Sequence, residues 1–254
     1  MPFLTVAGVR VHYVCREPVP VIFPPAVFIH GAGGTHQHWL YQVRDLPHSS
    51  TFALDLPGHG RSEGEGRDTI AAYGDWLVAC LDAASLEKAV LVGHSMGGAI
   101  ALDVALRHPA RVAGLGLIAT GARLRVAPAI LDGIRQYPEA AVRLICDTAF
   151  GPEASPEMAR LGRRQMAAIP PDVLHGDFVA CDAFDVLGRL SGIAAPALVL
   201  CGTQDVLTPI KYSIYLRDQI PNTTLHLVEE AGHMVMVEQP QSVSQALGSF
   251  LSGL

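Results

Sequence analysis

Short apolar runs alternate with amphipathic segments along most of the chain. Six of these runs are apolar on both faces, which is typical of strands buried in a parallel sheet; they cover residues 26–30, 51–55, 89–93, 112–119, 197–202 and 225–228. Before them, residues 3–14 alternate apolar and polar positions on either side of Ala7 and Gly8. That pattern predicts an antiparallel hairpin at the edge of the sheet.

The segments between the apolar runs have helical spacing. One begins after Asp68, a predicted N-cap, and repeats apolar residues at steps of three and four; these are Ile70, Tyr73, Leu77, Cys80, Leu81 and Ala84. Val243, Leu247, Phe250 and Leu251 repeat in the same way near the end of the chain. Alternating strands and helices predict an α/β fold, with a doubly wound, mostly parallel sheet of about eight strands.

The regular recurrence of predicted strands stops between residues 121 and 194. This stretch is helical in character and is broken by several prolines. We therefore predict a core formed by residues 1–120 and 195–254, with a helical cap of residues 121–194 inserted after the sixth strand. Such a lid would exclude water from a site and select its substrate. The alternative is a run of packing helices with no role in recognition.

The length and the net charge of the chain indicate which classes of protein it can belong to. A chain of 254 residues, half of them hydrophobic, can bury one large core. Its net charge is -6, and its 18 basic and 24 acidic residues are mixed without a basic run, so no nucleic-acid partner is expected. The start of the chain lacks a signal-peptide pattern, and no stretch is apolar for about 18 residues. We expect a cytoplasmic protein without a membrane span.

The cysteines favour neither a disulfide framework nor a zinc site. They are odd in number, widely scattered and never in a C-x-x-C pair; they stand at Cys15, Cys80, Cys146, Cys181 and Cys201. Small buried thiols in a reducing compartment are the prediction. No H-x-x-x-H or paired-acid pattern suggests a metal, and no cofactor is expected.

The sequence Gly93-His94-Ser95-Met96-Gly97-Gly98 stands between a predicted strand and a predicted helix. A serine at so tight a turn needs glycines two residues before and after it to avoid clashes. The start of the following helix offers free N–H groups and a positive dipole end to an oxyanion. Ser95 is therefore the predicted nucleophile. His94 projects in a different direction, and a structural role is predicted for it.

Five motifs in this order resemble the α/β-hydrolase superfamily, in its serine-nucleophile branch. They are residues 30–34 (HGAGG), 55–62 (DLPGHGRS), 93–98 (GHSMGG), 202–205 (GTQD) and 232–233 (GH). The resemblance spans residues 3–254, and the predicted cap falls where this family carries its cap. The GHSMGG motif is also similar to that of monoacylglycerol-lipase-like members.

A serine hydroxyl needs a base, and the base needs a partner that fixes its tautomer. Among eleven histidines, His233 follows the last predicted strand at the same sheet edge as Ser95, and the family places its catalytic histidine in a matching Gly-His pair. Asp205 follows the strand at 197–202, which gives the order Ser95, Asp205, His233 expected for this fold. The other position from which relatives draw the acid, residues 119–122, holds no carboxylate.

Two backbone amides are the predicted oxyanion hole. One belongs to Met96, directly after the nucleophile, and by resemblance the second belongs to Ala32. The neighbouring His30 is expected to order this loop. The DLPGHGRS segment also holds residues whose side chains are of catalytic types, but they are expected to organise turns; these are Asp55, His59 and Arg61.

The resemblance implies acyl transfer to water through an acyl-enzyme. We predict a carboxylic ester hydrolase for a small or medium acyl substrate, a small-molecule partner. Serine in place of aspartate argues against halide and epoxide chemistry. A lactonase, a perhydrolase or a carbon-carbon bond hydrolase would use the same triad, although Met234 stands where the last class often carries tryptophan. A protein that senses a ligand with little turnover is the alternative of a different class.

Overall fold

A computed structural model describes residues 2–254 and shows one twisted sheet of eight strands in the order β1-β2-β4-β3-β5-β6-β7-β8. The strands are β1 (Phe3–Val6), β2 (Val9–Arg16), β3 (Phe23–Ile29), β4 (Ser49–Leu54), β5 (Ala89–His94), β6 (Val112–Ile118), β7 (Ala197–Gly202) and β8 (Thr223–Val228). The first two pairings, β1 with β2 and β2 with β4, are antiparallel, and the pairings from β4 to β8 are parallel. The predicted hairpin and doubly wound sheet are confirmed.

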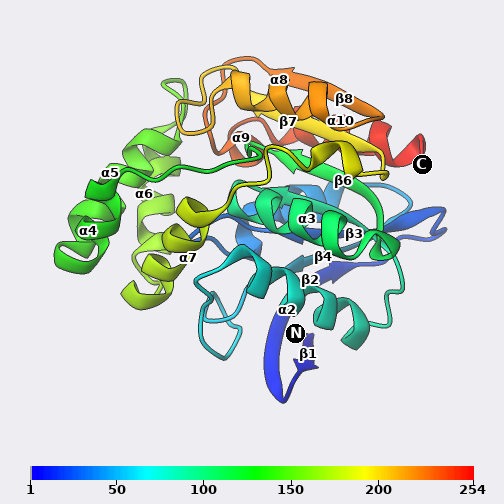
Figure 1. The fold of residues 1–254 in the computed structure, drawn as a ribbon, viewed down its shortest axis with the longest axis horizontal. Coiled ribbons are helices and arrows are strands. Elements are labelled where there is room, and N and C mark those ends of the chain that lie inside the picture. The colour runs from blue at the N-terminus through cyan, green and yellow to red at the C-terminus, as the bar shows by residue number, and fades with distance from the viewer. Residues whose placement is uncertain (1) are drawn as a thin grey trace.

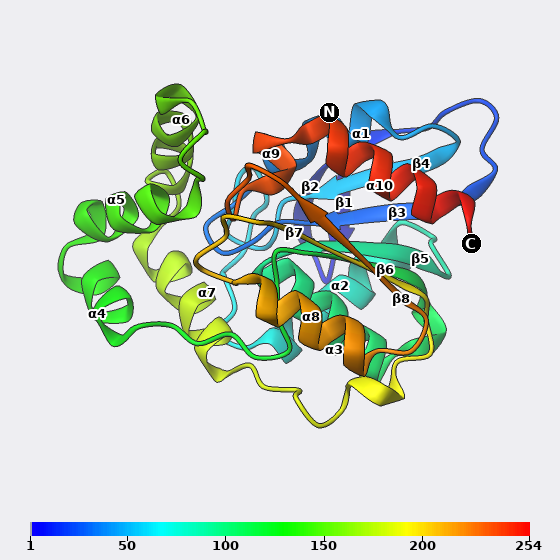
Figure 2. The same ribbon diagram turned by 90° about the horizontal axis from the view of Figure 1, so that it is seen from above.

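Helices cover both faces of the sheet (Figures 1 and 2). On one face lie α2 (Ile70–Ala83), α3 (Met96–Arg107) and α8 (Ile210–Gln219). On the other lie α1 (Leu40–Asp45), α9 (Val235–Glu238) and α10 (Pro240–Ser252). Short 3-10 turns at His36–Trp39, Pro109–Arg111 and Leu190–Gly192 complete the connections. Each face of the sheet therefore has its own hydrophobic core.

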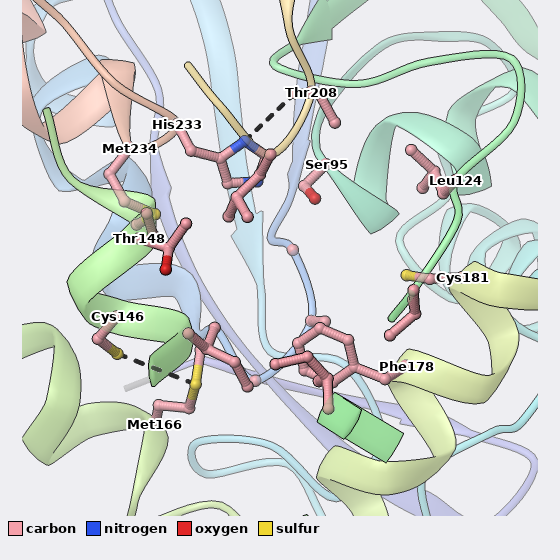
Figure 3. Close-up of a pocket in the computed structure, with 18 of the residues that line it drawn as sticks. Ser95, Leu124, Cys146, Thr148, Met166, Phe178, Cys181, Thr208, His233 and Met234 are labelled. Carbon is pink, nitrogen blue, oxygen red and sulfur yellow. Dashed lines mark hydrogen bonds between the residues drawn. The ribbon is translucent and has the colours of Figure 1, made fainter. Parts of the chain in front are cut away.

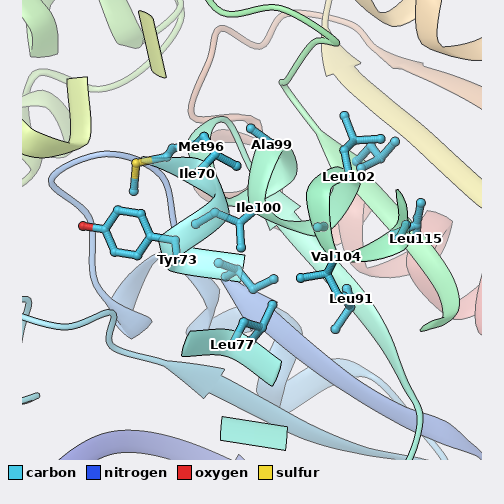
Figure 4. Close-up of a cluster of buried hydrophobic side chains, with 14 of the residues drawn as sticks. Ile70, Tyr73, Leu77, Leu91, Met96, Ala99, Ile100, Leu102, Val104 and Leu115 are labelled. Carbon is cyan, nitrogen blue, oxygen red and sulfur yellow. The ribbon is translucent and has the colours of Figure 1, made fainter. Parts of the chain in front are cut away.

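The packing of α2 against α3 shows why the amphipathic pattern forms this layer (Figure 4). Tyr73 and Leu77 of α2 are fully buried with Ile100 of α3. The N-cap of α2 is Thr69, whose hydroxyl accepts the N–H of Ala72 at 3.2 Å, so the prediction of Asp68 was wrong by one residue. The cap must stand directly before the first helical residue, which is Ile70.

Four helices beside the core occupy the middle of the chain (Figures 1 and 2). They are α4 (Pro128–Gln136), α5 (Pro138–Ala149), α6 (Pro156–Met166) and α7 (Pro171–Ala183). Each begins with proline, which fits a first helical position because that N–H has no intrahelical partner. They share a small apolar cluster, and the segments that enter and leave them pair at Arg123 and Asp185. All four lie within residues 121–194, and the division into core and cap stays a prediction.

All five cysteines are free thiols, and four of them are buried. The expectation of buried thiols was wrong for Cys15, which is exposed in β2. β1 pairs only with the Val9–His12 part of β2, so Cys15 stands in the half of the strand that lacks this outer neighbour. Across residues 2–254, no helix combines the length and the apolar character needed to cross a membrane.

The register of the parallel strands brings the predicted motifs to one edge. Ile29 pairs with Gly93, Gly93 with Leu117, and Gly202 with Val228. Each of these residues stands at or next to the carboxyl end of its strand. The loops that follow β3, β5, β7 and β8 therefore begin side by side, at the edge where α/β sheets place their ligand sites.

Candidate active site

Ser95 occupies a strained turn between β5 and α3. Its φ of 51° and ψ of -115° lie in a backbone region that side chains with a Cβ rarely adopt. A Cβ on Gly93 would overlap the backbone of Gly97, and one on Gly97 would overlap the carbonyl of Ile29. The Thr120 hydroxyl donates to the Ser95 carbonyl at 2.7 Å. Close packing around the backbone of this turn holds the serine in this conformation.

His233 and Asp205 are hydrogen-bonded, with 2.9 Å between His233 Nδ1 and Asp205 Oδ2. Asp205 also accepts the backbone N–H groups of Leu207 and Thr208 at 2.8 and 2.9 Å, and the Thr208 hydroxyl at 2.7 Å. Burial raises the pKa of the Asp205 carboxyl, but the His233 ring and these donors lower it more, so its net pKa is well below the ordinary value. Asp205 is therefore a carboxylate near neutral pH.

A carboxylate can only accept, so the bonded Nδ1 of His233 carries a proton, and in the neutral ring Nε2 is the nitrogen with the lone pair. His233 and Ser95 line the same cavity, and Figure 3 shows both at the end of it that holds Thr208. Within residues 2–254, the Ser95 hydroxyl forms no hydrogen bond, and hydrogen bonds of this kind often tighten only when substrate binds. The fold therefore brings the predicted residues Ser95, Asp205 and His233 together, and their catalytic roles stay a prediction.

His94 supports the histidine loop. Its Nε2 donates to the backbone carbonyl of His233 at 3.0 Å, and the two rings lie 4.7 Å apart between centroids. Burial, together with the nearby His233 ring, holds the pKa of His94 well below its ordinary value. His94 is therefore a neutral packing residue, in agreement with the structural role predicted for it.

His30 orders the loop of residues 31–34. Its Nε2 accepts the N–H of Leu56 at 3.0 Å, and its Nδ1 therefore donates to the carbonyl of Gly31 at 2.8 Å. A Cβ on Gly31 would lie 3.2 Å from the Cβ of Ser95, so the loop packs directly against the serine turn. Its next residue, Ala32, lines the cavity together with Ser95.

Met96 is the first residue of α3 and is fully buried. The first N–H groups of a helix have no intrahelical partner, and they stand at the positive end of its dipole. The predicted second donor, Ala32, approaches Ser95 from the loop after β3. The pairing of these two amides as an oxyanion hole stays a prediction.

The cavity has a volume of about 450 Å³, within the range of small-molecule sites. Its far end, opposite Ser95, is formed by the cap, with Met166 and Phe178 (Figure 3). Most of the remaining wall is also apolar; it includes Leu124, Val126, Ile130, Leu144, Ile145, Phe150, Leu207 and Met234. A ligand in this cavity would place an apolar part against the cap and a reactive part at Ser95.

One group of metal-ligating residue types lies outside the cavity. His12, His36 and Asp55 bring their donor atoms within 4.8 Å of one another. Both histidines already bond Asp55 through Nδ1, at 2.8 and 2.9 Å, and the same carboxylate accepts the backbone N–H groups of His36 and Arg61. With its oxygens so occupied, Asp55 organises the turn after β4, the role predicted for it from the sequence.

Comparison with known proteins agrees with this geometry. The model of the α/β hydrolase fold family matches residues 24–240. The chain belongs to the α/β-hydrolase family. It is similar to a solved thermophilic esterase, with 35% identity, a TM-score of 0.88, and coverage of 99% of this chain and 97% of that one.

Two curated relatives are also similar to this α/β hydrolase. A putative carbamate hydrolase, RutD, of a Caulobacter species (strain K31) is 32% identical over 88% of each chain. The dihydrolipoyllysine-residue acetyltransferase component of the acetoin cleaving system of Pseudomonas putida is 34% identical over 89% of this chain. The match spans only 63% of that relative's length. The carbamate hydrolase and the esterase support hydrolytic activity.

The sequence did not predict three polar residues that lie in or near this hydrolase's candidate site. Thr208 bonds Asp205 and lies 3.2 Å from His233 Nδ1, and its place three residues after the acid is the only local signal for it. Glu238 and Asp177 accept backbone N–H groups from distant loops. No spacing in the sequence reveals those two contacts.

Proposed function

We propose that this α/β hydrolase is a carboxylic ester hydrolase that forms an acyl-enzyme on Ser95. His233 is the general base, Asp205 the supporting acid, and the amides of Ala32 and Met96 the oxyanion hole. The observation that carries the proposal is the His233 ring, held through Nδ1 by the buried Asp205 carboxylate in the cavity that Ser95 also lines.

The proposed reaction follows from these positions. His233 Nε2 takes the Ser95 proton as the hydroxyl attacks the ester carbonyl, and the two amides bind the developing oxyanion. The same nitrogen then protonates the departing alcohol. Water then attacks the acyl carbon as His233 accepts its proton. The bond between the acyl carbon and Ser95 Oγ breaks, His233 returns the proton to this oxygen, and the carboxylic acid leaves. Asp205 keeps its negative charge throughout and stabilises the imidazolium formed in each step.

The cavity supports an ester with an apolar acyl chain of small or medium length. Its walls offer aliphatic and aromatic side chains over about 450 Å³, whereas polar groups gather near Ser95. A carbamate is smaller and more polar than this space requires. The same walls would also accept an apolar lactone, whose ring opening needs the same attack by serine.

A chain-length series tests the proposal. We expect turnover of p-nitrophenyl acetate, butyrate, hexanoate and octanoate, and we expect Ser95→Ala to lower kcat by on the order of 10⁶-fold. Equal rates for wild type and Ser95→Ala would refute the role of Ser95. Tight ligand binding with negligible turnover across the series would favour a sensing protein. A carbamate, a lactone and a vinylogous carbon-carbon substrate in the same assay would show whether the ester is the preferred bond.

A further inference from the structure

The carboxylate of Asp177 joins the cap to the oxyanion loop. Asp177 lies in α7 and is 0% exposed. Its Oδ2 accepts the backbone N–H of Gly33 at 2.8 Å and bonds His59 Nε2 at 2.8 Å, and its Oδ1 accepts the Tyr73 hydroxyl at 2.5 Å. The three partners come from three separate segments of the core. One buried carboxylate thus fixes the loop after β3, the turn after β4 and the helix α2 relative to one another.

The other members of this group are also fully bonded. His59 Nδ1 bonds the carbonyl of Pro57 at 3.0 Å, and a carbonyl can only accept. Both ring nitrogens therefore donate, and His59 forms a buried ion pair with Asp177. Burial lowers the pKa of His59, but the Asp177 charge and hydrogen bond raise it more, and its net pKa is raised. A fully satisfied buried network of this kind is rigid.

Gly33 receives this hydrogen bond at a position that permits little movement. Its φ is +63°, and a Cβ there would lie 2.6 Å from Leu174 Cδ1 and 3.0 Å from Met166 Cγ, both in the cap. The N–H held by Asp177 belongs to the peptide unit directly after Ala32. The Ala32 N–H belongs to the preceding peptide unit, so fixing the unit after Ala32 restrains the direction of the Ala32 N–H from one side.

We propose that Asp177 is a positioning residue for the reaction, which holds residues 31–34 so that the Ala32 amide faces the oxyanion formed at Ser95. The inference rests on the proposed function, because it assigns Asp177 an effect on that reaction's transition state. Asp177 itself is not part of the cavity wall. It acts through Gly33, across the boundary between the cap and the core.

The expected effect is on kcat more than on KM. A misplacement of about 1 Å at a reacting group can lower the rate about 100-fold, and loss of one oxyanion donor lowers it by a similar or larger factor. For Asp177→Asn we expect kcat to fall about 10- to 100-fold, with KM changed by less than about threefold. Affinity for a trifluoromethyl ketone, which forms a tetrahedral oxyanion on the serine, falls with kcat.

The matched control is Asp182→Asn, the same change one turn further along α7. The Asp182 carboxylate accepts the N–H of Val126 within the cap, and within residues 2–254 it bonds no residue of the loop after β3. We expect it to leave kcat and the affinity for the ketone within about twofold of wild type. Asp177→Glu keeps the buried charge opposite His59 but displaces the carboxyl group by one methylene. This variant is expected to fold and to have a lower kcat than wild type, so it can replace Asp177→Asn in the test if that variant does not fold.

Amide hydrogen exchange over residues 31–35 provides a readout that needs no turnover. We expect this segment to lose protection in Asp177→Asn and to keep it in Asp182→Asn. If wild type hydrolyses no ester, the proposed function fails, while the exchange data still report on the loop. If wild type is active and a folded Asp177→Asn keeps its kcat and its protection, the inference about Asp177 is overturned. Equal losses of kcat in Asp177→Asn and Asp182→Asn would overturn it as well.

Discussion

The Glu238 carboxylate, in the helix that follows His233, accepts the backbone N–H of Gly151 at 2.9 Å. The same oxygen accepts the N–H of Gly232 at 3.0 Å, directly before His233. The N–H of His233 in turn donates to the carbonyl of Ala149 at 2.8 Å. The end of α5 and the histidine loop are thus fastened together, and the cap is anchored to the core beside the proposed base.

Glu238→Ala should lower the free energy of unfolding and displace the histidine loop. Two N–H groups would lose their acceptor, and an unsatisfied buried donor costs about 1–3 kcal/mol. We expect a loss of about 2 kcal/mol in urea unfolding, together with a lower kcat. Glu238→Gln keeps an oxygen at the same place and should recover most of both. Equal stability of the Ala and Gln variants would contradict the role of this oxygen.

The strained backbone of Ser95 predicts that glycine is tolerated there better than alanine. Both variants lack the hydroxyl, but only alanine keeps a Cβ at a φ of 51°. The backbone strain that alanine keeps and glycine relieves is about 1–3 kcal/mol. The greater freedom of glycine in the unfolded chain offsets about 0.4–1 kcal/mol of that gain. Ser95→Gly should therefore exceed Ser95→Ala by about 1 kcal/mol in free energy of unfolding. Ala79→Gly, within α2, should instead lower the free energy of unfolding, because glycine is unfavourable in the interior of a helix.

Gly33 and Gly8 form a matched pair for testing the contact between the cap and the oxyanion loop. Both have positive φ, but a Cβ on Gly8 has no atom within 4 Å, whereas one on Gly33 would lie 2.6 Å from Leu174. Gly8→Ala should lower the free energy of unfolding by only about 1–2 kcal/mol, the strain of an alanine backbone at positive φ. Gly33→Ala should cost more and should also lower kcat. Adding Leu174→Ala to Gly33→Ala should relieve part of the extra loss, and no relief would contradict the predicted overlap.

Buried neutral histidines predict that the protein loses stability on mild acidification. Burial lowers the pKa of His38 to about 4 and holds those of His30 and His94 well below their ordinary value. Their pKa in the unfolded chain is about 6.5. Below that pH the unfolded chain binds protons that the folded chain does not, so the free energy of unfolding falls as pH falls.

His38→Gln tests this origin. It should reduce the slope of stability against pH between about 6.5 and 4 by at most about 1.4 kcal/mol per pH unit. Asp205, whose pKa is lowered, loses its contribution only below about pH 4. The raised pKa of His59 acts above pH 6.5, where stability falls as pH rises. Both lie outside this window, so an unchanged slope in urea titrations would refute the assignment to His38.

The sequence was sufficient to predict the sheet and to predict that the three proposed triad residues lie close together, because both depend on local patterns. Apolar runs mark each buried strand, and Ser95, Asp205 and His233 follow three strands that end at one edge. The contacts of Asp177 and Glu238 could not be predicted in this way. Their backbone partners, Gly33 and Gly151, lie 144 and 87 residues away in the chain. Such pairs depend on how the cap meets the core, which no spacing rule encodes.

Phe178 should limit the length of the acyl chain that the cavity accepts. It lies in α7 at the end of the cavity away from Ser95 (Figure 3). Phe178→Ala would open space there for further methylenes of an extended acyl chain. Each buried methylene is worth about 0.8 kcal/mol, or roughly fourfold in kcat/KM. The ratio of kcat/KM for octanoate to that for butyrate should therefore rise by about fourfold or more.

The control for this prediction is Leu161→Ala in α6. Leu161 is 44% exposed and is not part of the cavity wall, so its removal takes a large apolar side chain from the cap without enlarging the site. The octanoate to butyrate ratio should stay at the wild-type value in that variant. A ratio that rises equally in both variants would mean that loosening of the cap, rather than the space left by Phe178, determines chain length. A ratio unchanged in a folded Phe178→Ala would place the acyl chain elsewhere in the cavity.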